Sequence, residues 1–178
     1  MSELIPGYTI RAGGVDRALL LKFMQRTYKE LFPEQDFSHL ARTVEQYYSK
    51  ETPLWWVDSR DQGSEDALRA DLRFRRQGLE TSGDYFSTTP VACLWAGNAI
   101  DQVRGDRYTH IFLLYVVPEH RRRGIGTALM QYAETWAKKR GDRQIGLQVF
   151  QCNQPALNLY NHLGYQSASI WMVKAFDP

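Results

Sequence analysis

The chain has 178 residues, of which 43% are hydrophobic and 24% are charged, and its formal net charge is +2. This length supports a hydrophobic core, and we expect residues 1–178 to form a single domain. The near balance of charges gives no support for a nucleic-acid partner. The sequence shows no secretory signal and no apolar run of the roughly 20 residues that cross a membrane. We therefore expect a cytoplasmic protein without a membrane partner, with free thiols at Cys93 and Cys152.

The first sixty residues predict two helices between two strands. Tyr8–Arg11 suits a short strand, and apolar residues recur at helical spacing over Val15–Phe32. A second amphipathic helix is predicted over Ser38–Lys50, with Ser38 as its N-cap. Leu54–Val57 is typical of a buried strand.

The segment Asp58–Thr89 differs in composition from its surroundings. It is rich in Asp, Arg, Gly, Ser and Gln and poor in large apolar residues, and its middle, Glu65–Gln77, suits a short polar helix. Loops of this length inside compact domains often have a function. Between a solvated insertion and a substrate lid, the composition favours the insertion.

The segment Val91–Phe150 alternates strands with a helix, which indicates an α/β fold. A strand is predicted over Val91–Ala96 and broken at Gly97. Thr109–Val117 is apolar almost throughout, as in a central strand that is covered on both faces. An amphipathic helix is predicted over Thr127–Arg140, and Ile145–Phe150 suits another strand.

The segment Val116–Thr127 joins a strand, a basic turn with two glycines and a helix in direct succession. The first backbone N–H groups of a helix lack partners and carry about half a positive charge, and glycine lets an anion approach them. Arg121–Arg123 add full charges at this point. The pattern predicts a diphosphate cradle made by the N–H groups from Arg122 to Thr127. A basic surface turn that only starts a helix is the alternative.

Two commoner phosphate motifs do not fit this turn. It lacks the Gly-Lys-Ser/Thr of a P-loop. It also lacks the dinucleotide fingerprint, because Leu129 stands at the third glycine position of that pattern.

The last thirty residues carry a second motif. A short helix is predicted over Pro155–Leu163, followed by one or two strands over Tyr165–Phe176. Asn153 can cap this helix or bind an amide-bearing ligand. Tyr160 lies seven residues further on, two helical turns away on the same side. A core aromatic is the alternative role for Tyr160.

Together the two motifs resemble the GNAT superfamily of acyl-CoA-dependent N-acetyltransferases over Thr109–Tyr165, and the second motif is similar to that of polyamine acetyltransferases. The resemblance implies a mixed, strongly twisted sheet with flanking helices. Its central strands, Thr109–Val117 and Ile145–Phe150, would splay to admit the cofactor. The implied activity is direct transfer of an acetyl group from acetyl-CoA to a primary amine of a small molecule or a protein. Family members often form dimers, and the sequence leaves a homodimer open.

The resemblance also implies roles for single residues. The backbone of Leu114, Tyr115 and Val116, where the strand would bulge, would pair with the pantetheine arm of acetyl-CoA. Tyr160 would be the general acid near the CoA sulfur. The implied cofactor site comprises Leu114, Tyr115, Val116, Arg121, Arg122, Arg123, Gly124, Ile125, Gly126, Thr127, Asn153 and Tyr160.

Proton transfer at this site poses two problems. Full transfer from a tyrosine to a thiolate is uphill by about 2 kcal/mol from their ordinary pKa values, so Tyr160 would act mainly as a hydrogen-bond donor. Polyamine acetyltransferases place a glutamate on the central strand, and the matching position here is Phe112. Other groups that could serve as the general base, each better explained by a solvated structural role, are His110, Glu119, Asp101, Asp106 and Asp84.

The missing strand carboxylate supports a second hypothesis, a non-catalytic acyl-CoA-binding or sensing module. The presence of Tyr160 argues against that hypothesis. No metal is expected, because His39, His120 and His162 lack metal-ligand spacing.

Overall fold

A computed structural model describes residues 1–14, 16–60 and 90–176. The polar helix expected over Glu65–Gln77 lies outside this range. The chain divides into two compact units, Met1–Gln148 and Val149–Pro178, and each is described by itself.

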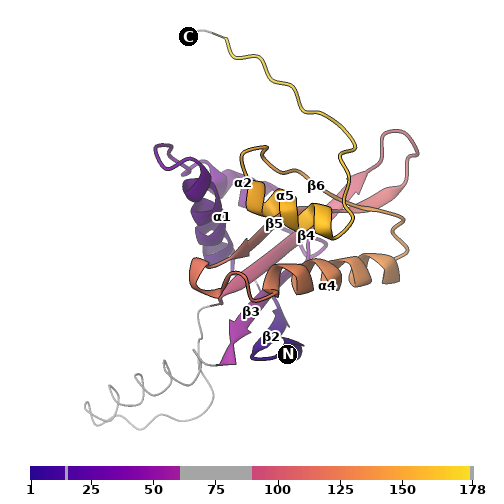
Figure 1. Ribbon diagram of the computed structural model, residues 1–178. Helices are drawn as coiled ribbons and strands as arrows, with labels where there is room; N and C mark the ends of the chain where they lie inside the picture. The colour runs from indigo at the N-terminus through magenta and orange to yellow at the C-terminus, as the bar shows by residue number, and fades with distance from the viewer. Residues whose placement is uncertain (15, 61–89, 177–178) are drawn as a thin grey trace. The chain divides into compact units, whose positions relative to one another are not determined.

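The first unit is built on a six-stranded sheet, and the sheet is mixed, as the resemblance implied (Figure 1). The strands lie in chain order across the sheet, and neighbours are antiparallel except for the parallel pair β5 and β6. Their bounds are β1 (Ser2–Ile5), β2 (Tyr8–Ala12), β3 (Leu54–Ser59), β4 (Ala92–Ile100), β5 (Arg107–Val116) and β6 (Ile145–Leu147).

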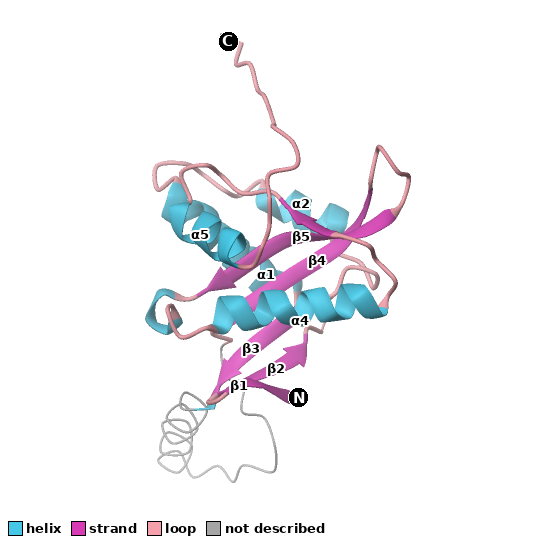
Figure 2. Cartoon of the chain, turned by 45° about the vertical axis from the view of Figure 1, so that its right-hand side comes forward, coloured by secondary structure: helices cyan, strands magenta, loops and turns pink. Residues whose placement is uncertain are grey.

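Helices cover both faces of this sheet (Figure 2). They are α1 (Arg17–Leu31), α2 (Leu40–Tyr47), a short 3-10 helix η1 (Pro118–His120) and α4 (Ile125–Lys139). Adjacent residues of β3 show the two layers, because successive side chains of a strand point to opposite faces. Trp56 packs edge-on against Phe23 of α1, with 5.2 Å between ring centroids. Trp55 packs against Trp136 of α4 at 5.3 Å.

The two N-terminal helices differ in how they begin. Asp16 caps α1, where its carboxylate accepts the N–H of Leu19 at 2.9 Å. The prediction of Ser38 as the N-cap of α2 is wrong, because α2 begins at Leu40 without a side-chain cap. Asp36 accepts both the N–H and the hydroxyl of Ser38, and this local turn competes with the helix start.

The predicted break at Gly97 is also wrong, because β4 continues through it to Ile100. The irregularity lies opposite, on β5: Trp95 pairs with Leu113 and Ala96 with Ile111, so Phe112 is an extra residue. This bulge lies two residues before the strip Leu114–Val116 where the resemblance placed it. The glycine has a steric reason: a Cβ at Gly97 would overlap the Phe112 ring.

The second unit contains one helix, α5 (Gln154–His162), close to its predicted bounds. The side chain of Asn153 caps it by accepting the N–H of Ala156 at 3.3 Å. The strands predicted over Tyr165–Phe176 are wrong: this segment is irregular and mostly exposed. A strand needs a neighbour to satisfy its backbone, and none of the described strands pairs with this segment.

Candidate active site

The turn between β5 and α4 has the conformation of an anion site. We call residues Arg121–Thr127 the anion turn. Arg122 and Gly124 both adopt the left-handed conformation, with φ of 62° and 84°, and α4 begins at Ile125. The predicted helix start at Thr127 is therefore two residues late. The left-handed Gly124 turns the chain into the helix without the steric cost that a side chain would add.

Six consecutive backbone N–H groups of this turn are free to bind a ligand. The N–H of Arg121 is used inside the turn, where it donates to the carbonyl of Pro118 at 3.1 Å, and the next N–H used is that of Ala128. No described residue accepts a hydrogen bond from the N–H groups from Arg122 to Thr127. This is the stretch that the sequence proposed for a diphosphate, and its partial positive charge suits an anion.

The three arginines of the turn have different environments. Arg121 donates to the carboxylate of Glu30 at 2.9 and 2.7 Å and to the carbonyl of Val116 at 2.8 Å. Arg123 donates to the hydroxyl of Tyr8 at 3.0 Å and to a backbone carbonyl of η1 at 3.1 Å. Arg122 is exposed, and no described carboxylate pairs with it. Two arginines thus brace the turn, and Arg122 is left for a bound anion.

Glu30 of α1 is a member of this site that the sequence did not reveal. Its carboxylate accepts the hydroxyl of Tyr115 at 2.7 Å as well as the guanidinium of Arg121. Burial and the adjacent Glu30 carboxylate raise the pKa of Tyr115 to about 12. Glu30 is 85 and 91 residues away from these partners, so no local pattern could have indicated the contact.

The edge of β5 on its β6 side is open along half of its length. β6 pairs with β5 only through Thr109–Ile111, and the strand predicted over Ile145–Phe150 ends at Leu147. No described strand pairs with Phe112–Val116 on this side. The separation of the two strands that the resemblance implied is therefore present in the pairing pattern.

Backbone alternation identifies which groups line the open edge. The N–H of Val117 donates to the carbonyl of Val91, beside β4, at 2.9 Å. Successive residues of a strand direct their backbone groups to alternate edges, so those of Val116 and Leu114 face the open side. Arg121 already occupies the Val116 carbonyl. The Val116 N–H and both backbone groups of Leu114 remain for an extended ligand. The backbone groups of Tyr115, which lies between them, face β4 instead.

The bulge position holds an aromatic cluster instead of a carboxylate. The Phe112 ring lies 4.7 Å from that of Trp95, 5.6 Å from that of Tyr47 and 5.4 Å from that of His110. Burial lowers the pKa of His110, which keeps its imidazole neutral near pH 7.

The acidic candidates near the β4–β5 hairpin have structural partners. Asp101 accepts the N–H groups of Val103 and Arg104 in the turn, and these bonds lower its pKa. Asp106 pairs with Arg143 at 3.6 Å. Asp84 lies outside the described residues. Glu119, next to the anion turn, is exposed and has no described cationic partner.

In the second unit, the predicted general acid is desolvated. Burial raises the pKa of Tyr160 to about 12, and its ring lies 5.8 Å from that of Tyr165. Tyr160 is therefore protonated at neutral pH, and complete proton transfer to a thiolate, whose conjugate thiol has a pKa of about 8.5, is strongly uphill. This environment suits a hydrogen-bond donor.

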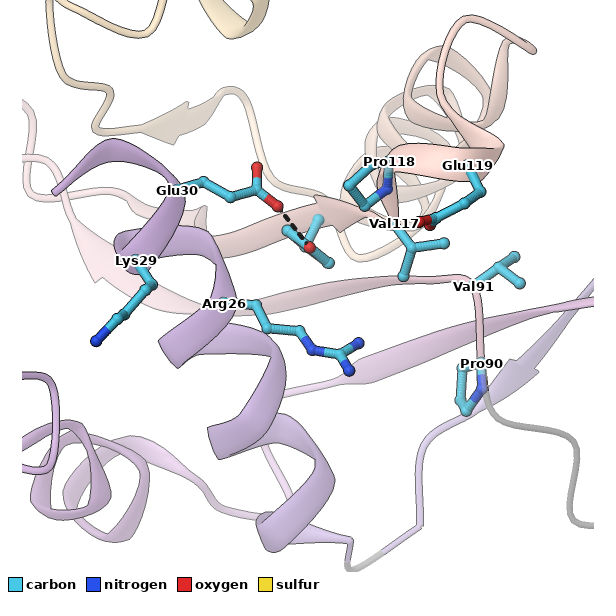
Figure 3. A pocket seen from close by; sticks show the side chains of 9 residues that line it. Arg26, Lys29, Glu30, Pro90, Val91, Val117, Pro118 and Glu119 are labelled. Atoms are coloured by element: carbon cyan, nitrogen blue, oxygen red, sulfur yellow. Dashed lines mark hydrogen bonds between the residues drawn. The ribbon is translucent and has the colours of Figure 1, made fainter. Parts of the chain in front are cut away.

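A pocket of about 500 Å³ opens between α1 and the end of β5 (Figure 3). Its floor is apolar and includes the buried Val91 and Tyr115. Its rim is charged: Arg26, Lys29 and Glu30 come from α1, and Glu119 comes from the opposite side. The volume lies in the range of small-molecule sites.

Among the described residues, no group of three or more His, Cys, Asp or Glu side chains could hold a metal ion. None of the described helices is both long and apolar enough to cross a membrane. Cys93 is buried, which raises the pKa of its thiol, and Cys152 is exposed.

The fold and the anion turn agree with what the resemblance to the GNAT superfamily implied. The model of the acetyltransferase (GNAT) family matches residues 21–165. The chain therefore belongs to this family, as the two motifs predicted.

Known relatives support this assignment. An uncharacterized N-acetyltransferase of Methanocaldococcus jannaschii is 28% identical over 168 residues, which cover 94% of this chain and 65% of that protein. The ribosomal protein bS18-alanine N-acetyltransferase of Escherichia coli K12 is 37% identical over 75 residues, 42% of this chain and 50% of that protein. The chain thus spans less than two thirds of the length of either curated relative. A predicted acetyltransferase of Clostridium acetobutylicum, solved with acetyl-CoA, has a TM-score of 0.65 at 16% identity, covering 94% of this chain and 96% of that chain.

Proposed function

We propose that the chain transfers an acetyl group directly from acetyl-CoA to a primary amine of a small molecule or a protein. The observation that carries the proposal is the anion turn, whose six N–H groups have no partner among the described residues and follow directly after a strand with an open edge. A diphosphate fits the turn, and an amide-bearing arm fits the edge. The structural neighbour solved with acetyl-CoA supports the same donor.

Different residues would bind different parts of acetyl-CoA. The N–H groups from Arg122 to Thr127 and the Arg122 guanidinium would bind the pyrophosphate. Leu114 and Val116 would pair with the pantetheine arm. Arg121 would hold the turn in place rather than contact the ligand, because its guanidinium is already bound to Glu30. Tyr160 would donate a hydrogen bond to the sulfur as negative charge develops on it.

The acceptor amine must lose its proton before it attacks. For an alkylammonium this costs about 4–5 kcal/mol at pH 7, and for an α-amine only about 1 kcal/mol. Phe112 supplies no carboxylate for this step. An acceptor whose amine has a low pKa therefore suits this chain best, and the E. coli relative, by its name, acts on an alanine of a ribosomal protein.

A non-catalytic acyl-CoA-binding module is the second candidate, and the aromatic cluster at Phe112 is the observation that favours it. One screen separates the two. The protein is mixed with acetyl-CoA and polyamines, amino acids, aminoglycosides or peptides, and released thiol is measured. Thiol release above background with any amine supports the enzyme. Acetyl-CoA binding without release for any amine would leave the binding module.

Replacement of Tyr160 by Phe tests whether its hydroxyl donates a hydrogen bond to the sulfur. We expect turnover to fall by about 10²-fold, the lower range for loss of a positioned proton donor, with little change in the dissociation constant of acetyl-CoA. Tyr165→Phe serves as the matched control, because it removes a hydroxyl from the neighbouring ring. Equal turnover in the Tyr160 variant and the wild type would leave Tyr160 a packing residue.

A further inference from the structure

The pocket between α1 and the end of β5 presents two opposite charges across an apolar floor. Figure 3 shows the Arg26 side chain reaching into it from α1, whereas Glu119 lies on the other side, beyond Val117. Lys29 also lines the rim, but its amine points away from the other labelled side chains.

The charges of Arg26 and Glu119 are unpaired within the described part of the chain. No described carboxylate lies within ion-pair distance of Arg26, and no described cation lies within that distance of Glu119. Glu30 differs from both, because Arg121 and Tyr115 already occupy its carboxylate. Arg26 also lies over the ring of Phe23, 5.9 Å from its centroid. Among the described lining residues other than Lys29, whose amine points away, the pocket thus offers the Arg26 cation and the Glu119 anion, without an ion-pair partner and on elements far apart in the sequence.

We infer that this pocket binds a zwitterion whose amine and carboxylate are separated by a hydrocarbon segment. The carboxylate would pair with Arg26, whose planar guanidinium suits it. The ammonium would pair with Glu119. The hydrocarbon would cover Val91 and Val117, where removal of apolar surface from water favours binding.

The two rim charges also predict what the pocket rejects. A polycation would place an ammonium beside Arg26, and a dicarboxylate would place an anion beside Glu119; like charges in contact oppose binding. A ligand with one charge of either sign would leave the other rim residue unpaired but solvated, and would bind more weakly than the zwitterion.

Equilibrium binding without acetyl-CoA tests the pocket directly. The probes are 4-aminobutyrate, 5-aminopentanoate and 6-aminohexanoate, each compared with the carboxylic acid and the amine of the same chain length. We expect one zwitterion of the series to bind about 10-fold more tightly than both of its singly charged analogues, because it gains one charge-assisted contact over each. Affinities equal to those of the analogues throughout the series would overturn the inference.

Two variants assign the contacts. Arg26→Gln should reduce the affinity of the best zwitterion to that of its amine analogue, and Glu119→Gln should reduce it to that of its acid analogue. Lys22→Gln on α1 and Glu45→Gln on α2 are controls that change the same charges at exposed positions outside the pocket. Circular dichroism checks that each variant is folded. Equal losses in the control variants would overturn the assignment of Arg26 and Glu119.

Discussion

The C-terminal end and the middle of the central strand β5 differ in what they provide. Its C-terminal end leads into the anion turn, where six main-chain N–H groups form the candidate site and side chains brace it. Its bulge at Phe112 is filled by packed aromatic rings, and no carboxylate lies in that position. Backbone recognition needs only a turn of the right shape, whereas acid–base chemistry needs a particular side chain. The chain therefore defines its donor more sharply than its acceptor.

The anion turn is the place where one substitution should have the largest effect. Gly124→Glu should weaken acetyl-CoA binding by more than about 100-fold, because it sets a carboxylate beside the phosphates and loss of charge-assisted hydrogen bonds costs about 1.5–3 kcal/mol each. Gly124→Ala separates charge from backbone strain: a Cβ here meets nothing within 4 Å, and the φ of 84° costs about 1–2 kcal/mol. Binding by isothermal titration calorimetry that stays unchanged in Gly124→Glu would refute the diphosphate site.

The difference between the anion turn and the bulge also explains what the sequence could predict. The anion turn is encoded in consecutive residues, so its glycines, its basic residues and its free N–H groups could be predicted. The Glu30 contact and the position of the bulge depend on residues from different elements. The contact was therefore not predicted, and the bulge implied at Leu114–Val116 lies two residues earlier, at Phe112. The irregular segment Tyr165–Phe176 shows the same limit, because a strand-like composition forms a strand only where a partner strand is available.

The braced and free arginines of the turn should respond differently to mutation. Arg122→Gln should weaken acetyl-CoA binding by about 10-fold, with an effect that shrinks at high salt, and leave the free energy of unfolding unchanged. Arg121→Gln should lower the free energy of unfolding by about 1 kcal/mol, because it removes a partly exposed pair with Glu30. Urea unfolding and calorimetry measure the two quantities. Equal changes in affinity and in the free energy of unfolding for both variants would contradict the assignment of Arg122 to binding and of Arg121 to stability.

The free energy of unfolding should be most sensitive to substitution at the bulge, where packed aromatic rings stand in place of a carboxylate. Gly97→Ala should lower the free energy of unfolding by about 1–3 kcal/mol, because the new Cβ overlaps the ring of Phe112. Combining it with Phe112→Leu should recover part of this loss, so the two substitutions should be non-additive. Additive losses in a double-mutant cycle by urea unfolding would show that the strain at Gly97 comes from elsewhere.

The smallest expected effect is a pH dependence from His110, beside the bulge. Burial lowers the pKa of His110 below its ordinary value of about 6.5, so the unfolded chain binds this proton more readily than the folded chain does. The stability that this group contributes is complete above pH about 6.5 and declines as the pH falls through the lower folded pKa. His110→Asn should flatten the dependence of the unfolding free energy on pH in this window and leave acetyl-CoA affinity unchanged, because His110 lies outside the anion turn. His39→Asn, at the exposed start of α2, is the control that should retain the slope. A slope that persists in His110→Asn would assign the proton to another group and separate the bulge from the pH response.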